Sequence, residues 1–562
     1  MVMKKNRFLN IIATCGFLIC SACSSHLTDI NVNPNGVDPS RANANLILPG
    51  VLSTLSGNYA SLDNGVMAGL VQHMQEDGWF TSFNHYTWDA RDWADWFDVL
   101  RNNDLLIKSS IQNGLPMHEG MGYVIRAFAF GNITDLWGDA PYTEALRANE
   151  NIIQPKYDNQ EIIYRGILDD LQKASTLFQN NTNAGIIPAN DLIYAGDINK
   201  WHRLANTLLL RYAMRLSEKL PELVTPIIKK VYDSGVYIQQ PSQDAVVNYL
   251  GNTGGDSWFL ARQFDVDGSI FRRRKIAKTI MDQLKTTNDP RLFVWIDPVH
   301  CQWVEDPLLA VKTDEFVRKN GVLQTYKSLT DEQYQAEITA GNKFTRHYNP
   351  TLLGSKLDTG LYVGVPVGVQ VPDATNMNPT PGQIVQNQHV SQLSKMYRQA
   401  TGPLLKRRIA SASETYFILA EAAQRGWITA NAENMYNEGI KASLTTWNIA
   451  DKYNTFIART AVKYNGTLER ILQQKWVASW NCSTEAWMDF RRTGFPKLVA
   501  GPASSEPVLP VRFIYGNNEI NANKDNVSAA IEALQETSHS KLRGKNSQWS
   551  KPWLLQGTNK PW

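Results

Sequence analysis

Residues 197–215 read DINKWHRLANTLLLRYAMR, and this stretch decides the fold class. Its apolar side chains Trp201, Leu204 and Leu208, with Leu216 just beyond, recur at the spacing of one face of an α-helix. We therefore expect a helix over residues 199–219. Such a helix is stable only when its apolar stripe is covered, so it must pack on a neighbour.

Similar patterns fill much of the remaining chain. Further helices are predicted over residues 92–112, 118–134, 159–179, 411–425, 431–447, 467–480 and 526–535. Helices of this length joined by short turns pack as antiparallel pairs. No strict repeat consensus is present, so the predicted fold is mainly α: an irregular, tetratricopeptide-like array of antiparallel helix pairs with long loops and a few short strands.

Two segments, near 236–270 and 290–400, have a different composition. They are rich in Gly, Pro, Asn and β-branched or aromatic residues, which predicts long loops with a few strands. Long ordered loops on a rigid scaffold commonly carry binding function. No linker divides the chain after residue 43, and we expect residues 44–562 to form a single domain that includes these two insertions.

The N-terminus reads as an export signal. Three basic residues precede an apolar run from Phe8 to Ile19 that is too short to span a bilayer, so residues 1–22 are predicted to be a signal peptide. The sequence Cys20-Ser21-Ala22-Cys23 that follows resembles a bacterial lipobox, with Cys20 where Leu is usual. We expect Cys23 to carry lipid, with residues 23–43 as an extended leader; the alternative is an ordinary secretory peptide cut near Ala22.

The charge balance argues against a nucleic-acid-binding protein. Residues 1–22 contain three of the 56 Lys and Arg residues and none of the 53 acids, so the remainder is formally neutral. The short basic stretch 272–275 is expected to be a solvated helix start. Cys15, Cys20 and Cys23 belong to the export signal and its lipobox, so only Cys301 and Cys482 remain in the body of the protein, and these either form a disulfide or stay as two buried thiols.

Several stretches together resemble the SusD/RagB family across nearly the whole mature chain, most closely its SusD-like lipoprotein branch. They are residues 29–35 (DINVNPN), 126–146 (RAFAFGNITDLWGDAPYTEAL), 155–171 (PKYDNQEIIYRGILDDL), 197–215, 413–427 (SETYFILAEAAQRGW), 474–496 (QKWVASWNCSTEAWMDFRRTGFP) and 509–526 (LPVRFIYGNNEINANKDN). The resemblance implies a helical scaffold with four tetratricopeptide-like pairs, a lipid anchor, and a lid over a SusC-like TonB-dependent transporter in the outer membrane. The ligands of this family are usually glycans and sometimes peptides, so the resemblance implies a ligand of one of these two kinds.

Aromatic residues in Gly-bearing loops are candidates for a glycan-stacking surface, because a flat ring covers the weakly hydrated face of a sugar. The predicted stacking residues are Trp79, Tyr86, Trp88 and Trp258, with Asn84, Asp89 and Asp256 as hydrogen-bonding partners. The other interpretation is that these rings fill small cores beneath the loops. Trp295 and Trp303 mark a further aromatic loop, whereas Trp476, Trp480, Trp487, Arg491 and Arg492 are interpreted as structural.

Catalytic and metal-binding motifs are missing from the sequence. The nine histidines are too far apart for a helical metal pair, and neither a GxSxG elbow nor a phosphate-binding loop occurs. We expect no cofactor, no metal and no enzymatic activity. The predicted function is therefore capture of oligosaccharides at the cell surface by an outer-membrane lipoprotein; the alternatives are a peptide ligand, or a surface glycoside hydrolase that uses two carboxylates.

Overall fold

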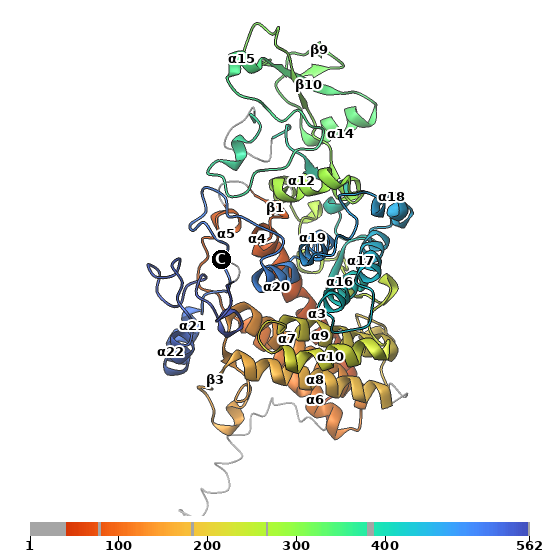
Figure 1. Ribbon diagram of the computed structural model, residues 1–562, viewed down its shortest axis with the longest axis vertical. Coiled ribbons are helices and arrows are strands. Elements are labelled where there is room, and N and C mark those ends of the chain that lie inside the picture. The colour runs from red at the N-terminus through yellow and green to blue at the C-terminus, as the bar shows by residue number, and fades with distance from the viewer. Residues whose placement is uncertain (1–40, 77–79, 181–184, 266–267, 379–386, 560–562) are drawn as a thin grey trace, which may run out of the picture.

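The computed structural model describes residues 41–76, 80–180, 185–265, 268–378 and 387–559. Helices fill the lower and middle parts of the molecule in Figure 1, and a smaller part with β9, β10, α14 and α15 stands at the opposite end. The predicted signal peptide, Cys23 and most of the leader lie outside the described residues. Within those residues, no helix combines the length and the apolar composition needed to cross a membrane.

The N-terminal part of the array consists of six long helices. They are α3 (Ala44–Leu62), α6 (Ala94–Gln112), α7 (Pro116–Trp137), α8 (Gln160–Asn180), α9 (Ile198–Arg215) and α10 (Pro221–Ser234). Neighbours along the chain pack together from α6 to α10, and α3 packs on α6. Helix α9 contains the 197–215 stretch, with Trp201, Leu204 and Leu208 buried as its spacing predicts.

The C-terminal part supplies a second helical layer. Its helices are α16 (Ala412–Gln424), α17 (Ala432–Thr446), α18 (Tyr453–Ile457), α19 (Leu468–Ala478), α20 (Thr484–Thr493), α21 (Asn517–Ala522) and α22 (Lys524–Glu532). Helix α16 packs on α17, on α19 and on α9 of the first layer, as the middle of Figure 1 shows. The prediction of a mainly α fold built from helix pairs is confirmed.

The motif LWGDAPY at residues 136–142 ends a helix. Helix α7 ends at Trp137, and Gly138 follows with φ 110°, a backbone conformation that residues other than glycine rarely adopt. The Gly138 N–H donates to the Thr134 carbonyl at 2.9 Å. Beyond it, the short strand β2 (Ala140–Pro141) pairs with β3 (Tyr157–Asp158).

Short strands connect the two layers to the end that carries β9 and β10. One sheet has the order β1 (Met74–Gln75), β5 (Lys275–Ile276), β11 (Gln392–Leu393) and β6 (Ile296–Asp297). A second has the order β7 (Gln302–Glu305), β10 (Phe344–Tyr348), β8 (Arg318–Lys319) and β9 (Val322–Leu323). Strand β12 (Lys406–Ala410) pairs with β4 (Ala245–Asn248).

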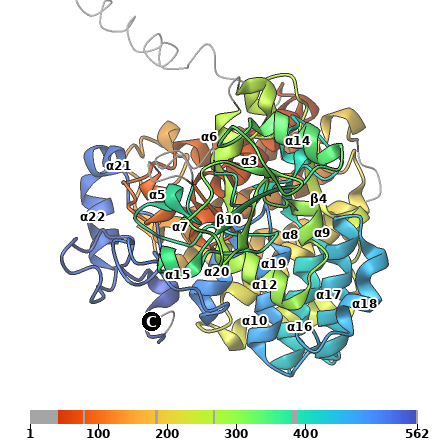
Figure 2. The same cartoon turned by 90° about the horizontal axis from the view of Figure 1, so that it is seen from above.

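Short helices accompany these strands. They are α4 (Ala68–Leu70), α5 (Thr81–Asn84), α11 (Ser269–Arg273), α12 (Lys278–Thr287), α13 (Leu292–Trp295), α14 (Asp331–Thr339) and α15 (Pro350–Leu353). Seen from above in Figure 2, β10 and α14 lie over the helical layers. The second sheet has a small core of its own, in which Cys301, Val317, Tyr334 and Phe344 are buried apart from the main core.

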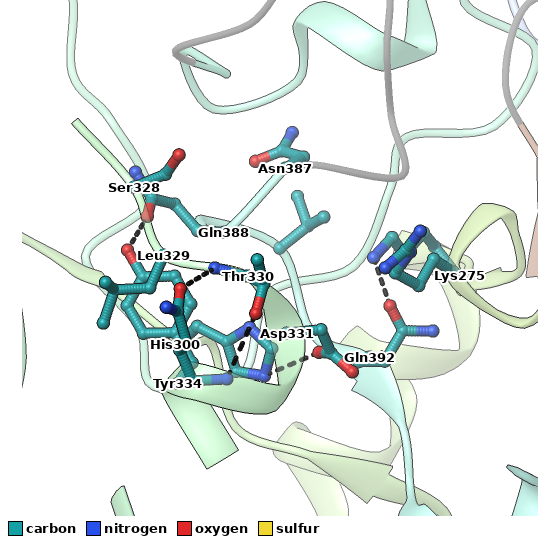
Figure 3. A pocket seen from close by; sticks show the side chains of 13 residues that line it. Lys275, His300, Ser328, Leu329, Thr330, Asp331, Tyr334, Asn387, Gln388 and Gln392 are labelled. Atoms are coloured by element: carbon teal, nitrogen blue, oxygen red, sulfur yellow. Dashed lines mark hydrogen bonds and ion pairs between the residues drawn. The ribbon is translucent and has the colours of Figure 1, made fainter. Parts of the chain in front are cut away.

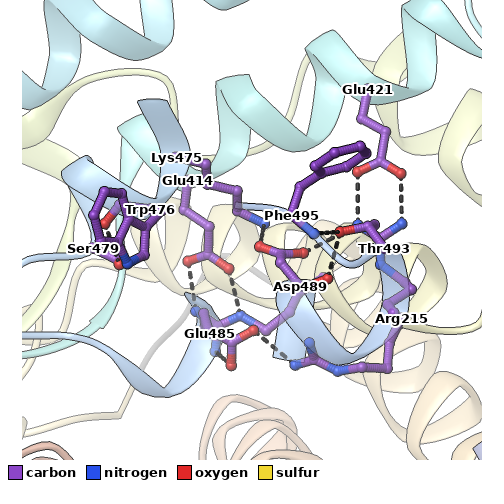
Figure 4. Close-up of polar contacts among 12 residues, drawn as sticks. Arg215, Glu414, Glu421, Lys475, Trp476, Ser479, Glu485, Asp489, Thr493 and Phe495 are labelled. Carbon is purple, nitrogen blue, oxygen red and sulfur yellow. Dashed lines mark hydrogen bonds and ion pairs between the residues drawn. The ribbon is translucent and has the colours of Figure 1, made fainter. Parts of the chain in front are cut away.

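Buried ion pairs tie the C-terminal layer to the N-terminal layer. Arg215 of α9 contacts Glu485 of α20 at 2.7 Å and Asp135 of α7 at 3.1 Å, and all three side chains are at most 10% exposed. Figure 4 shows this network continuing through Lys475, which lies 2.7 Å from Asp489. These pairs explain why helices with many charged residues lie in the interior.

The prediction that Trp476, Trp480, Trp487, Arg491 and Arg492 are structural agrees with their placement, because all five side chains are buried. Arg492 contacts Glu421 of α16 at 2.5 Å and Asp489 at 3.1 Å. The Trp295 ring stacks on Trp480 with a centroid separation of 4.9 Å, so this loop aromatic belongs to the core as well.

The fold decides the state of the two cysteines and corrects the prediction for the basic stretch. Cys301 and Cys482 are both free, so they form no disulfide with each other. The basic stretch 272–275 is not a solvated helix start: it ends α11 and begins β5, and Arg274 and Lys275 are 6% and 2% exposed. The prediction was wrong because Lys275 lies in a central strand of the first sheet, where both neighbouring strands cover it.

Candidate functional site

A polar cavity of about 400 Å³ lies between the first sheet and helix α14. Its walls come from four separated parts of the chain: Arg272, Lys275, His300, Ser328, Leu329, Thr330, Asp331, Gln333, Tyr334, Asn387, Gln388, Val390 and Gln392. Figure 3 shows Lys275 and Gln392 on one side of this cavity and Ser328, Leu329 and Tyr334 on the other. We refer to it as the polar cavity.

One wall of the polar cavity is fixed by strand register. Lys275 of β5 lies between Gln75 of β1 and Gln392 of β11, so the side chains of Lys275 and Gln392 leave the sheet side by side. The Lys275 ammonium donates to the Gln392 side-chain oxygen. The Gln392 amide donates to the carbonyls of Phe271 at 2.9 Å and Arg274 at 3.2 Å, which anchors the end of α11 against the sheet.

The opposite wall is built by the start of α14. Thr330 caps this helix, since its hydroxyl accepts from the Gln333 N–H while its own N–H donates to the Gln333 side chain at 2.9 Å. The cap presents Asp331 in the first turn, where its carboxylate lies 3.3 Å from His300 Nε2 and pairs with Arg398.

Tyr334, one turn further along α14, joins the wall to the small core. Its ring stacks on His300 with centroids 5.1 Å apart, and its hydroxyl donates to Gln388. The Gln388 amide in turn donates to the Lys327 carbonyl at 3.1 Å. Tyr334 is 1% exposed and also packs against Phe344, so packing holds this wall in place.

The electrostatic environment of the polar cavity is dominated by cations. Burial, together with the neighbouring Arg272 and Arg398, lowers the pKa of Lys275 to about 7. Burial, with Lys275 and Arg398 nearby, lowers the pKa of His300 to about 3, so this ring is neutral at pH 7. The lining therefore presents amides, hydroxyls, a neutral imidazole and a lysine amine that is charged below about pH 7, which are groups that hydrogen-bond a polar ligand.

Metal chemistry finds no support in the described residues. No group of three or more His, Cys, Asp or Glu side chains in that part of the chain is arranged to hold a metal ion. Asp331 is the one carboxylate among the described residues that line the polar cavity, and it is already engaged by Arg398 and His300.

The aromatic residues predicted to form an open stacking surface lie elsewhere. Trp79 is outside the described residues, and Tyr86, Trp88 and Trp258 are 0%, 6% and 3% exposed. The Trp88 ring packs edge-on against Phe513 at 5.2 Å and Trp487 at 5.9 Å, and its indole N–H donates to the Ser82 carbonyl at 2.9 Å.

Trp258 is surrounded in the same way, with its ring centroid 4.8 Å from that of Phe259 and 5.5 Å from that of Tyr397. The expectation of exposed rings was thus wrong for Tyr86, Trp88 and Trp258. Packing against other side chains removes the apolar area of each ring from water, and this burial determines the positions of the three rings.

The predicted hydrogen-bonding partners are also dispersed. Asn84 is 1% exposed, and its amide closes the 76–84 loop by accepting from the Glu76 N–H and donating to the Glu76 carbonyl, both at 2.9 Å. Asp256 is half-buried and accepts from the Thr253 N–H at 2.7 Å inside its own turn. These two side chains serve the local backbone.

Asp89 and Trp88 do line a cavity, but a different one. This second cavity, of about 220 Å³, is formed with Thr87, Ile514, Arg543, Asn546, Ser547 and Gln548. Asp89 is exposed at its rim, whereas Trp88 contributes only the small part of its ring that is not packed. Of the predicted ligand-binding residues that the structure describes, Trp88 and Asp89 are the two that line this cavity together.

The residues of the polar cavity were missed individually, although most of them fall within the 290–400 segment that was expected to carry binding function. Helical periodicity does not identify them, because they lie on short strands, one helix start and loops. The sequence signal for this site was the basic stretch 272–275, which supplies Arg272 and Lys275 to the lining but was predicted to be solvated.

Comparisons with known proteins identify the fold. The model of the SusD-like_2 family, described as "Starch-binding associating with outer membrane", matches residues 34–308 and 343–516. A solved chitin-binding protein is 22% identical with a TM-score of 0.68, covering 92% of this chain and 100% of its own. A SusD homologue from Bacteroides fragilis is 19% identical with a TM-score of 0.66 and the same coverage.

A third solved structure, a chitin-binding SusD homologue from Flavobacterium johnsoniae, is 19% identical with a TM-score of 0.64, covering 91% of this chain and 99% of its own. No curated protein sequence matches this chain.

Proposed function

Since this chain belongs to the SusD-like family, which is described as starch-binding and associated with the outer membrane, we propose that it is a non-catalytic lipoprotein that captures oligosaccharides at the cell surface. Lipid on Cys23 anchors it to the outer membrane. The captured ligand passes to a SusC-like TonB-dependent transporter, over which the protein acts as a lid. The polar cavity is the proposed binding site.

The observation that carries this proposal is the chemistry of the polar cavity. Its volume of about 400 Å³ falls within the ~300–1,000 Å³ range of small-molecule sites. Sugar hydroxyls both donate and accept hydrogen bonds, and the amides of Gln388 and Asn387 and the hydroxyls of Ser328 and Thr330 do the same.

Gln388 retains capacity for a ligand. It accepts one hydrogen bond from Tyr334 and donates one to the Lys327 carbonyl, which leaves one N–H and one lone pair of its amide for a sugar hydroxyl. Since both existing contacts fix the amide plane, the remaining positions are preorganised, and binding costs little side-chain entropy.

The two alternatives have less support. A glycoside hydrolase needs two carboxylates on either side of the scissile bond. Of the described lining residues only Asp331 carries one, and it is paired with Arg398, so the described lining offers no second carboxylate for the reaction. A peptide ligand remains the alternative within binding proteins, but the description of the matched family favours glycans.

A pair of matched variants tests the site. Gln388→Leu removes a buried amide from the polar cavity, whereas Gln548→Leu removes one from the second cavity, and each glutamine is 3% exposed. Calorimetric titration with malto-, chito- and acidic oligosaccharides should show affinity lowered about two- to ten-fold by Gln388→Leu and unchanged by Gln548→Leu, since one hydrogen bond contributes about 0.5–1.5 kcal/mol. Equal effects of two folded variants would remove the polar cavity from the proposal.

Three further measurements address catalysis, the lipid anchor and the transporter partner. When the protein is incubated with an oligosaccharide that it binds, the number of reducing ends should not increase. An increase would favour the glycoside hydrolase. A radioactive fatty acid should label the wild type and not Cys23→Ala. Purification from detergent-solubilised outer membranes should retain the transporter, and repeated isolation of the protein alone would contradict the partnership.

A further inference from the structure

The acidic side chains at the polar cavity are already matched by arginines. Asp331 pairs with Arg398, and the neighbouring Glu332 pairs with Arg262. Each of these two carboxylates therefore has an arginine as its partner, and neither neutralises Lys275.

Lys275 is a buried cation that faces the polar cavity without a carboxylate. It is 2% exposed, and among the described residues its ammonium takes part in no ion pair and donates to a single acceptor, the neutral Gln392 amide. An ammonium group has three N–H donors, so two are left for a ligand. Figure 3 shows this side chain at the cavity wall, with its one dashed contact to Gln392.

A buried ammonium without a counter-charge is costly, because desolvation is not repaid by attraction to an opposite charge. The group either releases its proton or binds an anion. The pKa of Lys275 is low because burial and two cationic neighbours all disfavour the charged form of its amine. The other titratable and charged groups that line the polar cavity or act on Lys275 or His300 are Arg272, His300, Asp331, Glu332, Tyr334 and Arg398. Asp297 lies near Arg398 and Lys395.

We propose that the polar cavity binds an acidic sugar, one that carries a carboxylate or a sulfate ester, with its negative group at Lys275. This inference rests on the proposed function, because it takes the ligand to be a glycan. The amides and hydroxyls on the opposite wall bind the hydroxyls of the same sugar. Neutral sugars lack the counter-charge that Lys275 requires, so the cavity discriminates against them.

The first test uses inorganic sulfate as the probe. Thermal unfolding is followed in sodium sulfate and in sodium chloride of equal ionic strength, for the wild type and for Lys275→Met, which keeps the length of the side chain and removes its charge. Sulfate stabilises folded proteins in general, and that part is common to both proteins. The wild type should gain more in melting temperature than the variant; equal gains would overturn the proposal.

The second test compares oligosaccharides of equal length: oligogalacturonate for the carboxylate, a sulfated galactan oligomer for the sulfate ester, and a neutral galacto-oligosaccharide. One acidic ligand should bind the wild type about ten- to a hundred-fold more tightly than it binds Lys275→Met, which is the loss of one charge-assisted hydrogen bond. The matched control is Lys278→Met, whose lysine is 48% exposed and pairs with Asp282, and it should bind as the wild type does.

The outcomes separate this inference from the proposed function. If the neutral oligosaccharide binds as tightly as the acidic ones and Lys275→Met leaves binding unchanged, the acidic sugar is wrong and glycan capture stands. Oligoglutamate is titrated as a fourth ligand, and if it alone binds, both are wrong and the ligand is a peptide. A sulfate effect that depends on Lys275, with no oligosaccharide bound, would also overturn the acidic sugar.

Discussion

Replacement of Glu485 by glutamine tests whether buried ion pairs hold the two helical layers together. Glu485 contacts Arg215 at 2.7 Å and Arg211 at 3.7 Å, and these three side chains are at most 10% exposed. Removing one partner of a buried pair typically costs about 3–5 kcal/mol. Because Arg215 keeps Asp135 and Arg211 keeps Glu414, we expect a loss near the lower limit, about 3 kcal/mol.

The matched control is Glu161→Gln on α8. Glu161 also accepts from an arginine, Arg165, at 2.7 Å, but these side chains are 34% and 48% exposed. An exposed pair four residues apart on a helix contributes about 0.3–0.5 kcal/mol. Urea unfolding followed by circular dichroism should therefore separate the two variants by about 2.5 kcal/mol if their m-values match the wild type.

The pH dependence supplies a second check on Glu485. Burial alone raises the pKa of this carboxyl, but Arg211 and Arg215 outweigh burial and hold it below the ordinary value. A lowered folded pKa gives stability that is present above the unfolded value of about 4.3 and is lost as the pH falls through the folded value. The difference in the free energy of unfolding between the wild type and Glu485→Gln should become smaller below about pH 4. If Glu485→Gln lowers the free energy of unfolding by less than about 1 kcal/mol at pH 7, the buried ion pairs do not hold the two layers together.

Three other outcomes are expected. Trp88→Ala should lower the free energy of unfolding by about 3–5 kcal/mol and leave affinity at the polar cavity unchanged, because this ring packs on Phe513 and Trp487; lost affinity with normal unfolding would contradict its burial. Lys275→Met should raise the melting temperature more at pH 6 than at pH 9, because the folded lysine is deprotonated above about pH 7 and the unfolded one only above about 10.4; a larger gain at pH 9 would reverse the sign. Dithiothreitol should not change the melting temperature, and Cys301 should react slowly with iodoacetamide until unfolding, since burial raises its pKa to about 12; rapid alkylation of the folded protein would contradict this.

The helical layers were predictable wherever apolar periodicity was strong. Predicted boundaries of 92–112, 159–179 and 431–447 correspond to Ala94–Gln112, Gln160–Asn180 and Ala432–Thr446. Helix α20 was not predicted as an element of its own, although every residue from Thr484 to Thr493 is buried. Its interior positions include Glu485, Asp489 and Arg492, which ion pairs make compatible with burial, and a pattern based on apolar residues does not detect them.

The candidate site was predictable only as a region. The 290–400 segment was expected to carry binding function, and it contributes His300, Asp331, Tyr334 and Gln388 to the polar cavity. Their convergence depends on strand register and on the cap of α14, which composition does not reveal. The aromatic residues gave a stronger sequence signal, but an indole that finds a core is buried whether or not its loop also contacts a ligand.

The separate small core beneath the polar cavity has a consequence for how such proteins diverge. Tyr334 is packed there with Cys301, Val317 and Phe344, away from the main core that stabilises the helical layers. We expect substitutions in the small core to act more on the cavity wall than on the helical layers, because the two cores are separate and local opening differs in free energy from one region to another. A change of ligand preference through this wall would then require little compensation in the helical scaffold.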